Sequence, residues 1–182
     1  MRELILGGQR SGKSARAETL AADWLTASPA HRAVFVATAT AWDDEIRERI
    51  ARHQRDRAQR VPGMVTVEEP VGLARALAAH DDARTLVVVD CLTLWLTNLL
   101  MPAQGEAAPA EAAAATLAST ITAHTGPLIL VSNEIGLGVI PMGRETRAFV
   151  DALGRLNQQV AAACDRVTLM AAGLPLTLKG KA

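Results

Sequence analysis

A glycine-rich segment close to the start of the chain restricts the folds that this sequence can adopt. The segment reads Gly7-Gly8-Gln9-Arg10-Ser11-Gly12-Lys13-Ser14 and fits the pattern G-x-x-x-x-G-K-[ST]. The apolar residues 3–6 before it are typical of a strand, and the Ala- and Leu-rich residues after it are typical of a helix. In that context the glycines let successive backbone N–H groups point at phosphate oxygens. The sequence therefore predicts a phosphate-binding loop; the alternative is a glycine-rich turn with a chance Lys-Ser pair.

A magnesium site is expected beside this loop. Lys13 would reach the β- and γ-phosphates of a nucleotide, and the Ser14 hydroxyl would bind Mg²⁺. Asp90 supplies a second partner, because it follows the apolar run Leu86-Val87-Val88-Val89. An acid at the end of such a strand holds Mg²⁺ in nucleoside triphosphatases. Many strands end in Asp, so this second pattern indicates a metal site only in combination with the phosphate-binding loop.

Short apolar runs alternate with longer helix-like stretches along the chain. Strands are predicted at residues 3–6, 33–38, 64–67, 85–90, 127–132, 166–170 and 175–178. Helices are predicted at residues 13–26, 43–59, 71–79, 92–100, 110–124 and 144–164. Strands that are apolar at almost every position are typical of parallel sheets covered on both faces. We therefore predict an α/β fold with a mostly parallel sheet and helices on both faces.

Composition excludes several classes of protein. The 182 residues, 49% of them apolar, can form one sizeable core, so we expect a single domain over residues 1–182. Nineteen basic residues balance nineteen acidic ones and aromatic residues are few, which argues against nucleic-acid binding. No apolar run approaches the ~20 residues of a membrane span. With no signal-peptide pattern either, we expect a cytoplasmic protein. Cys91 and Cys164 fit neither a disulfide framework nor a zinc pattern.

The arginine-rich helix predicted at residues 43–59 is a second candidate for chemistry. Acidic residues open it and arginines close it, which suits the helix dipole. His53 shares a face with Arg49 and Arg57, four residues away on either side. The guanidinium groups disfavour the protonated imidazole, so His53 could act as a neutral nucleophile while the arginines hold a triphosphate. The alternative is an exposed histidine on a solvated, salt-bridged helix.

Polar residues also stand at the end of the strand predicted at residues 127–132. Ser132, Asn133 and Glu134 end or follow that strand. Ligands bind at the carboxyl edge of parallel sheets, so we expect these side chains to face the site. The alternative is the polar start of a loop.

Several segments together resemble one protein family, and the similarity extends almost from end to end. Besides the glycine-rich loop, the matching segments are Val36-Ala37-Thr38-Ala39, Asp43-Asp44-Glu45, Arg49-Ile50-Ala51-Arg52-His53, Thr66-Val67-Glu68-Glu69-Pro70, Asp90-Cys91-Leu92-Thr93, Thr97-Asn98-Leu99-Leu100, Val131-Ser132-Asn133-Glu134-Ile135-Gly136-Leu137-Gly138, Arg155-Leu156-Asn157-Gln158 and Gly173-Leu174-Pro175-Leu176. With these segments the chain resembles the bifunctional adenosylcobinamide kinase/adenosylcobinamide-phosphate guanylyltransferases of cobalamin biosynthesis. The segment around Asn133 and the helix that carries His53 make the resemblance specific.

The resemblance implies a RecA-like P-loop NTPase domain that catalyses two reactions. The first phosphorylates the aminopropanol hydroxyl of adenosylcobinamide, with ATP or GTP as the donor. The second transfers GMP from GTP to that phosphate through a guanylylated His53, which gives adenosylcobinamide-GDP and pyrophosphate. The family forms homotrimers, so a homotrimer is expected here.

The resemblance also implies the site residues. His53 and Lys13 are expected to be catalytic, and Ser14 and Asp90 to bind Mg²⁺. The implied nucleotide-binding residues are Gly7, Gly8, Gln9, Arg10, Ser11, Gly12, Lys13, Ser14, Ala37, Thr38, Ala39, Gln54, Arg55, Asp56, Arg57, Glu68 and Asp90. A carboxylate such as Glu68 can accept hydrogen bonds from guanine N1–H and N2–H₂, which would favour GTP over ATP.

Two departures from the family pattern concern the guanine site. Arg52 stands where the family often has a second histidine, and an aromatic residue usual shortly after the helix is missing, since Met64 is found there. Two other functions stay open. One is a plain P-loop kinase of small molecules, in which His53 is a surface residue. The other is a nucleotide-dependent switch or assembly ATPase.

Overall fold

The computed structural model describes residues 1–40, 44–102 and 105–181, apart from the side chains at positions 44–46, 49, 50 and 53. The elements follow one another as β1 (Arg2–Gly7), α1 (Lys13–Ala27), β2 (Arg32–Ala37), α2 (Asp44–Arg60), β3 (Val65–Glu68), α3 (Leu73–Ala79), β4 (Thr85–Asp90), α4 (Leu92–Leu100), α5 (Ala110–Ala123), β5 (Leu128–Val131), α6 (Arg144–Ala163), β6 (Arg166–Ala171) and β7 (Leu174–Lys179). The predicted helices and strands are confirmed, with ends that shift by a few residues. The predicted helix start at Asp43 lies outside the described residues.

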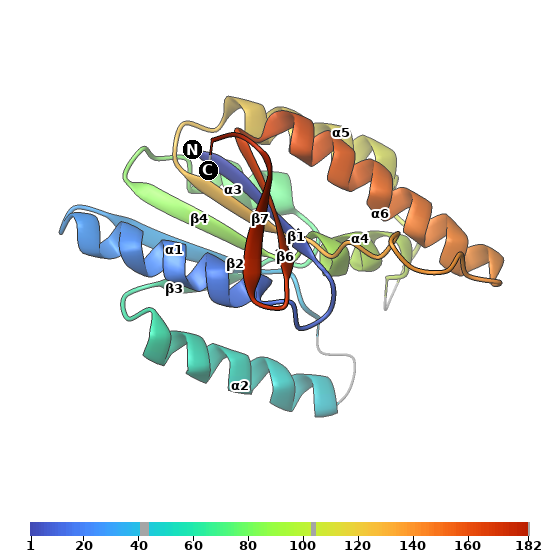
Figure 1. The fold of residues 1–182 in the computed structure, drawn as a ribbon, viewed down its shortest axis with the longest axis horizontal. Coiled ribbons are helices and arrows are strands. Elements are labelled where there is room, and N and C mark those ends of the chain that lie inside the picture. The colour runs from blue at the N-terminus through green and yellow to red at the C-terminus, as the bar shows by residue number, and fades with distance from the viewer. Residues whose placement is uncertain (41–43, 103–104, 182) are drawn as a thin grey trace.

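The strands form one seven-stranded sheet in the order β3-β2-β4-β5-β1-β6-β7 (Figure 1). Neighbouring strands are parallel, except that β6 and β7 form an antiparallel hairpin. Asp90 at the end of β4 lies opposite Ala37 of β2 and Val131 of β5, and Val131 in turn lies opposite Ile5 of β1. The segments that follow β1, β4 and β5 therefore meet at one edge of the sheet.

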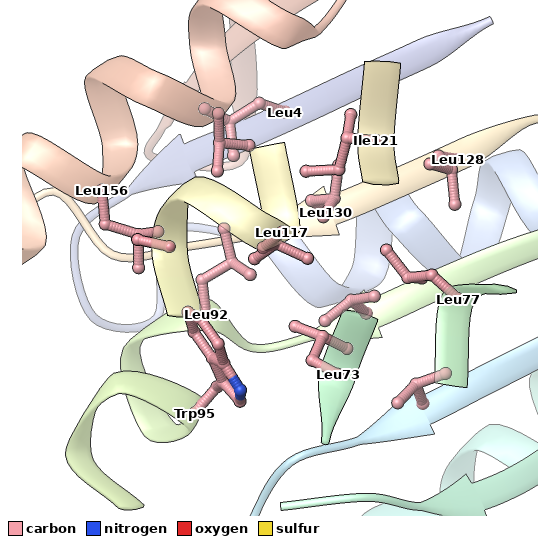
Figure 2. Packing of buried hydrophobic residues seen from close by; sticks show 14 of the residues in the cluster. Leu4, Leu73, Leu77, Leu92, Trp95, Leu117, Ile121, Leu128, Leu130 and Leu156 are labelled. Atoms are coloured by element: carbon pink, nitrogen blue, oxygen red, sulfur yellow. The ribbon is translucent and has the colours of Figure 1, made fainter. Parts of the chain in front are cut away.

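Alternation along the strands separates two apolar layers. On one face, side chains such as Leu4, Val89 and Leu130 pack against helices α3, α4, α5 and α6. Figure 2 shows part of this core, in which strand residues lie beside Leu73, Leu77, Leu92, Trp95, Leu117, Ile121 and Leu156. On the other face, Ile5 and Phe35 pack against α1. The predicted arrangement of helices on both faces is confirmed.

The two apolar layers stabilise the sheet and the edge at which the segments after β1, β4 and β5 meet. Each fully buried Leu or Ile contributes roughly 1.5–3 kcal/mol relative to an exposed side chain. Trp95 is buried within the larger core, and its indole N–H donates to the Val71 carbonyl at 2.8 Å, so the core contains a satisfied polar group. Among the described residues, no helix is both long enough and apolar enough to span a bilayer.

Candidate functional site

The glycine-rich loop leaves β1 and enters α1 with backbone angles that favour glycine. Gly12 has φ +100°, and a Cβ atom at Gly7 would lie 2.5 Å from the Met170 carbonyl oxygen. Arg10 also has positive φ, at 55°, which is uncommon for a residue with a side chain. These conformations turn the chain tightly enough to carry it from strand to helix. The predicted strand–loop–helix arrangement is confirmed, and the exposed Gln9 and Arg10 lie at its tip.

The turn between β6 and β7 supports this loop from outside. The Gly173 amide donates a hydrogen bond to the Ser11 carbonyl at 3.0 Å. A Cβ atom on Gly12 would lie 3.2 Å from the Gly173 Cα, so the two backbones approach closely. The sequence does not predict this contact, although Gly173 begins one of the segments that resemble the family.

Lys13 is the first residue of α1 and is 8% exposed. Its Nζ donates to the Gly8 carbonyl at 2.7 Å, so the ammonium lies across the loop. Burial lowers the pKa of Lys13, and the nearby carboxylate of Asp90 acts in the opposite direction. A partly desolvated ammonium at this place is ready to exchange a carbonyl partner for an anionic phosphate oxygen.

Ser14 and Asp90, predicted as the metal ligands, are in direct contact. The Ser14 hydroxyl donates to Asp90 Oδ2 at 2.7 Å. Burial raises the pKa of Asp90, while the Ser14 hydrogen bond and the charges of Lys13 and Arg57 act to lower it. A buried carboxylate that gains a cation recovers part of its lost solvation.

The donor chemistry of this pair fits Mg²⁺. One hydroxyl oxygen and one carboxylate are the hard oxygen ligands that Mg²⁺ prefers, and protein sites usually leave its other positions to phosphates and water. Among the described residues, no group of three or more His, Cys, Asp or Glu could hold a metal ion by itself. Ser14 and Asp90 therefore suit a cation that arrives with a nucleotide.

Thr38 and its neighbours connect the ends of β2 and β4. The buried Thr38 hydroxyl donates to the Cys91 carbonyl at 2.7 Å and accepts from the Cys91 amide at 2.8 Å. Asn98 of α4 donates to the Thr38 carbonyl at 2.8 Å. The Thr38 side chain thus holds the sheet edge together, and Ala37 and Ala39 lie on either side of it. Asn98 is a supporting residue whose role the sequence did not indicate.

Helix α2 contacts the sheet through Arg57 and Gln54. Arg57 is buried, with its guanidinium carbon 3.5 Å from the centre of the Phe35 ring and Nη2 3.3 Å from the Thr66 hydroxyl. Burial lowers the pKa of Arg57. Gln54 Nε2 donates to Glu68 Oε1 at 3.1 Å, which joins the helix to the end of β3.

The remaining residues predicted in α2 differ in their surroundings. Arg55 is exposed, and Asp56 lies 3.6 Å from Arg60 in an ion pair. Arg60 also donates to Glu18 of α1 at 2.6 Å, so α2 is fixed against α1. His53 belongs to α2, one residue before Gln54, and its side chain lies outside the described part of the structure.

The segment after β5 lies against the phosphate loop. The Glu134 amide donates to the Gly7 carbonyl at 3.1 Å. The Asn133 amide donates to the Thr93 hydroxyl at 3.0 Å, and Asn157 of α6 donates to the Asn133 carbonyl at the same distance. Ser132 is fully buried, and its hydroxyl has no hydrogen-bond partner within the described residues. The structure therefore brings this segment to the same sheet edge as Lys13, Ser14 and Asp90.

Comparison with known proteins agrees with the motifs. A family model described as "Cobinamide kinase / cobinamide phosphate guanyltransferase" matches residues 3–178. The chain is 47% identical over 181 residues to the bifunctional adenosylcobalamin biosynthesis protein CobP of Pseudomonas aeruginosa, covering 100% of this chain and 99% of that protein. It is 34% identical over 187 residues to the bifunctional adenosylcobalamin biosynthesis protein CobU of Escherichia coli, covering 97% and 98% of the two chains.

A solved structure shares the fold at low sequence identity. The flagellar accessory protein FlaH from Methanocaldococcus jannaschii is 12% identical, with a TM-score of 0.55 over 99% of this chain and 78% of that one. At this identity the likeness concerns the fold alone. Together with the sheet order and the glycine-rich loop after β1, it confirms the predicted RecA-like α/β fold.

Proposed function

Because the chain belongs to the cobinamide kinase / cobinamide phosphate guanyltransferase family, we propose that it catalyses both of these reactions on adenosylcobinamide. The first phosphorylates the aminopropanol hydroxyl. The second transfers GMP from GTP to the new phosphate and releases pyrophosphate. The observation that carries this proposal is the contact of Ser14 with Asp90 beside the buried Lys13, in a chain that matches the family over residues 3–178.

In the kinase step the protein positions charge around a phosphoryl group. Lys13 would leave the Gly8 carbonyl and bind the β- and γ-phosphates, where it offsets the charge that develops on the leaving diphosphate. Backbone N–H groups of the loop would hold the phosphate oxygens. Bound Mg²⁺ would add positive charge, held by Ser14 and Asp90. ATP and GTP would both suit this site, because the loop would contact only the phosphates, which the two nucleotides share.

In the guanylyl step we propose that His53 is the nucleophile. An imidazole nitrogen would attack the α-phosphorus of GTP and form a phosphoramidate, which splits one transfer into two. Gln54, the next residue along α2, is bonded to Glu68 at the end of β3. That contact ties the part of α2 that carries His53 to the strand end where Glu68 could accept the guanine N1–H and N2–H₂ groups.

Association of three copies is part of the proposal. β7 is the last strand of the sheet, and Leu174, Leu176 and Leu178 are 55–70% exposed along it. An apolar edge strand is a common place for chains to associate. Sedimentation should show a trimer that Leu176→Lys weakens, whereas Thr177→Lys, at the next position and so on the opposite face of the strand, should not weaken it. We also propose that the enzyme works in the cytoplasm.

A two-stage assay tests the proposed activities. The purified protein is incubated with adenosylcobinamide and ATP, and then with GTP, while the phosphate and GDP products are resolved separately. We expect adenosylcobinamide phosphate in the first stage and adenosylcobinamide-GDP in the second. If adenosylcobinamide phosphate forms but adenosylcobinamide-GDP does not, the protein is a plain kinase. If it hydrolyses nucleotide at a rate that cobinamide does not change, it is a switch or assembly ATPase.

A further inference from the structure

We propose that Glu134 is the catalytic base of the kinase step, an assignment that rests on the proposed function. Its carboxylate would accept the proton of the substrate hydroxyl while that oxygen attacks the γ-phosphorus. The O–P bond to the substrate forms as the bond between the γ-phosphorus and the β,γ-bridging oxygen breaks. The nucleoside diphosphate leaves with that electron pair, and the proton passes from Glu134 to water.

The position of Glu134 supports this role. Its amide is hydrogen-bonded to Gly7, the first residue of the phosphate loop, at 3.1 Å. Val131, three residues earlier, lies opposite both Asp90 and Ile5, so the segment leaves the sheet between the acid and the loop. A group at this place would lie next to the phosphates of a bound nucleotide, on the side where ligands approach a parallel sheet.

The Glu134 carboxylate is held in place by a hydrogen bond to the backbone and not by any basic side chain that the structure describes. The Gly136 amide donates to Glu134 Oε1 at 3.0 Å, and the side chain is only partly exposed. The preceding residue, Asn133, is fixed on two sides by Thr93 and Asn157. Within the described part of the chain, Glu134 makes no ion pair. An oriented carboxylate that keeps one oxygen for a substrate proton meets the geometric need of a general base.

Other acids near this edge are already engaged. Asp90 accepts from Ser14, with which it would hold Mg²⁺, and Glu68 accepts from Gln54 at the end of the edge strand β3. Glu69 accepts from the Val71 and Gly72 amides and from Arg75 at the start of α3. Glu18 is paired with Arg60. Of the described acids at this edge, Glu134 is thus the one that lies beside the phosphate loop and is not assigned to Mg²⁺, to guanine or to an ion pair.

The test separates the two activities in one protein. Glu134→Gln keeps an oxygen that can accept the Gly136 amide, but it removes the basic carboxylate. We expect the kinase kcat with adenosylcobinamide and ATP to fall about 10²-fold or more, with KM for ATP unchanged. GMP transfer to pre-made adenosylcobinamide phosphate should proceed at the wild-type rate. Glu111→Gln, an exposed position on α5, is the matched control and should change neither reaction.

A truncation gives a second, independent readout. In Glu134→Ala, added formate should restore part of the kinase rate, because a small carboxylate can occupy the vacated space and accept the proton. Formate should not affect the wild-type protein. A folded Glu134→Gln that keeps the wild-type kinase kcat overturns the assignment, and so does an equal loss of both activities. If wild-type protein makes no adenosylcobinamide phosphate, it is the proposed function that fails.

Discussion

The backbone amide of Gly173 is hydrogen-bonded to the carbonyl of Ser11 at 3.0 Å, so the turn of the C-terminal hairpin supports the phosphate loop near the N-terminus. Gly173 has φ +80° and no atom within 4 Å of the position where a Cβ would lie. A substitution at Gly173 therefore acts through its backbone conformation rather than through a clash.

Gly173→Ala should weaken ATP binding as well as the fold. A left-handed conformation costs an L-residue roughly 1–2 kcal/mol, and relief of that strain would move the amide away from Ser11. Gly63→Ala is the control, because Gly63 has φ +89° and equally open surroundings but precedes β3 at the opposite edge of the sheet. The melting temperature should fall by a similar amount in both variants, while only Gly173→Ala should raise the Kd for a fluorescent ATP analogue. Equal nucleotide affinity in the two variants would show that the hairpin turn is irrelevant to the loop.

Lys13→Met should strongly slow the kinase step without destabilising the protein. The substitution keeps an unbranched side chain but removes the cation expected at the β- and γ-phosphates, so the rate should fall by about 10²-fold or more. Burial already lowers the pKa of Lys13, so loss of the charged ammonium costs the fold little. Steady-state kinetics and thermal melts measure both effects, with Lys181→Met as the control. A wild-type phosphorylation rate in Lys13→Met would refute the role given to this lysine.

Asp90→Asn should make the ligand-free protein more stable and less active. Burial raises the pKa of Asp90, so the folded protein binds a proton there more tightly than the unfolded chain does. The ionised group therefore lowers the unfolding free energy at a pH above its folded pKa, and this penalty disappears as the pH falls below the pKa of the unfolded chain. The variant should melt at a higher temperature than wild type near pH 7, and the difference should shrink towards about pH 4.

The same variant should require more Mg²⁺, because one charged ligand is lost. Asp23→Asn, an exposed position on α1, is the control and should change neither the melting temperature nor the Mg²⁺ requirement. A lower melting temperature for Asp90→Asn at pH 7, together with an unaltered Mg²⁺ requirement, would mean that Asp90 serves the fold alone.

Glu68→Gln should relax the choice between GTP and ATP. The amide can accept one guanine N–H but presents a donor to the other, and a mispaired polar group that the bound base covers would cost binding energy. It also disturbs the contact with Gln54, whose Nε2 now donates to Glu68 Oε1. GTP affinity, measured by calorimetry, should fall more than ATP affinity. Glu48→Gln on the exposed side of α2 should leave both unchanged, and an equal loss of both affinities in Glu68→Gln would assign Glu68 to the fold.

Local signals made most of the fold predictable. The strands before Gly7 and Asp90 are short apolar runs with polar ends, and a parallel sheet brings such ends to one edge, so the contact of Ser14 with Asp90 follows from the pattern. The hairpin support at Gly173 and the two hydrogen bonds between Thr38 and Cys91 were not predictable. They join residues far apart in sequence whose types carry no spacing signal.

The arginine-rich helix shows a second limit of sequence reasoning. Periodicity places Arg57 on the face of His53, and the structure adds that its guanidinium packs on the Phe35 ring in a buried position. Helical spacing carries no signal for a ring that belongs to another element, so this contact was not predictable, and the part of Arg57 in binding a triphosphate stays a prediction. The roles of His53 and of the guanine-binding residues stay predictions.

The covalent intermediate is the most direct test of the whole account. Wild-type protein is incubated with GTP, and its intact mass and its peptides are then measured. We expect one GMP on His53 that is labile in acid and stable in base, as a phosphoramidate is, and that moves to adenosylcobinamide phosphate when this substrate is added. Folded His53→Ala should carry no GMP, accumulate adenosylcobinamide phosphate and make no adenosylcobinamide-GDP. Production of adenosylcobinamide-GDP by that variant at the wild-type rate would contradict the proposed mechanism.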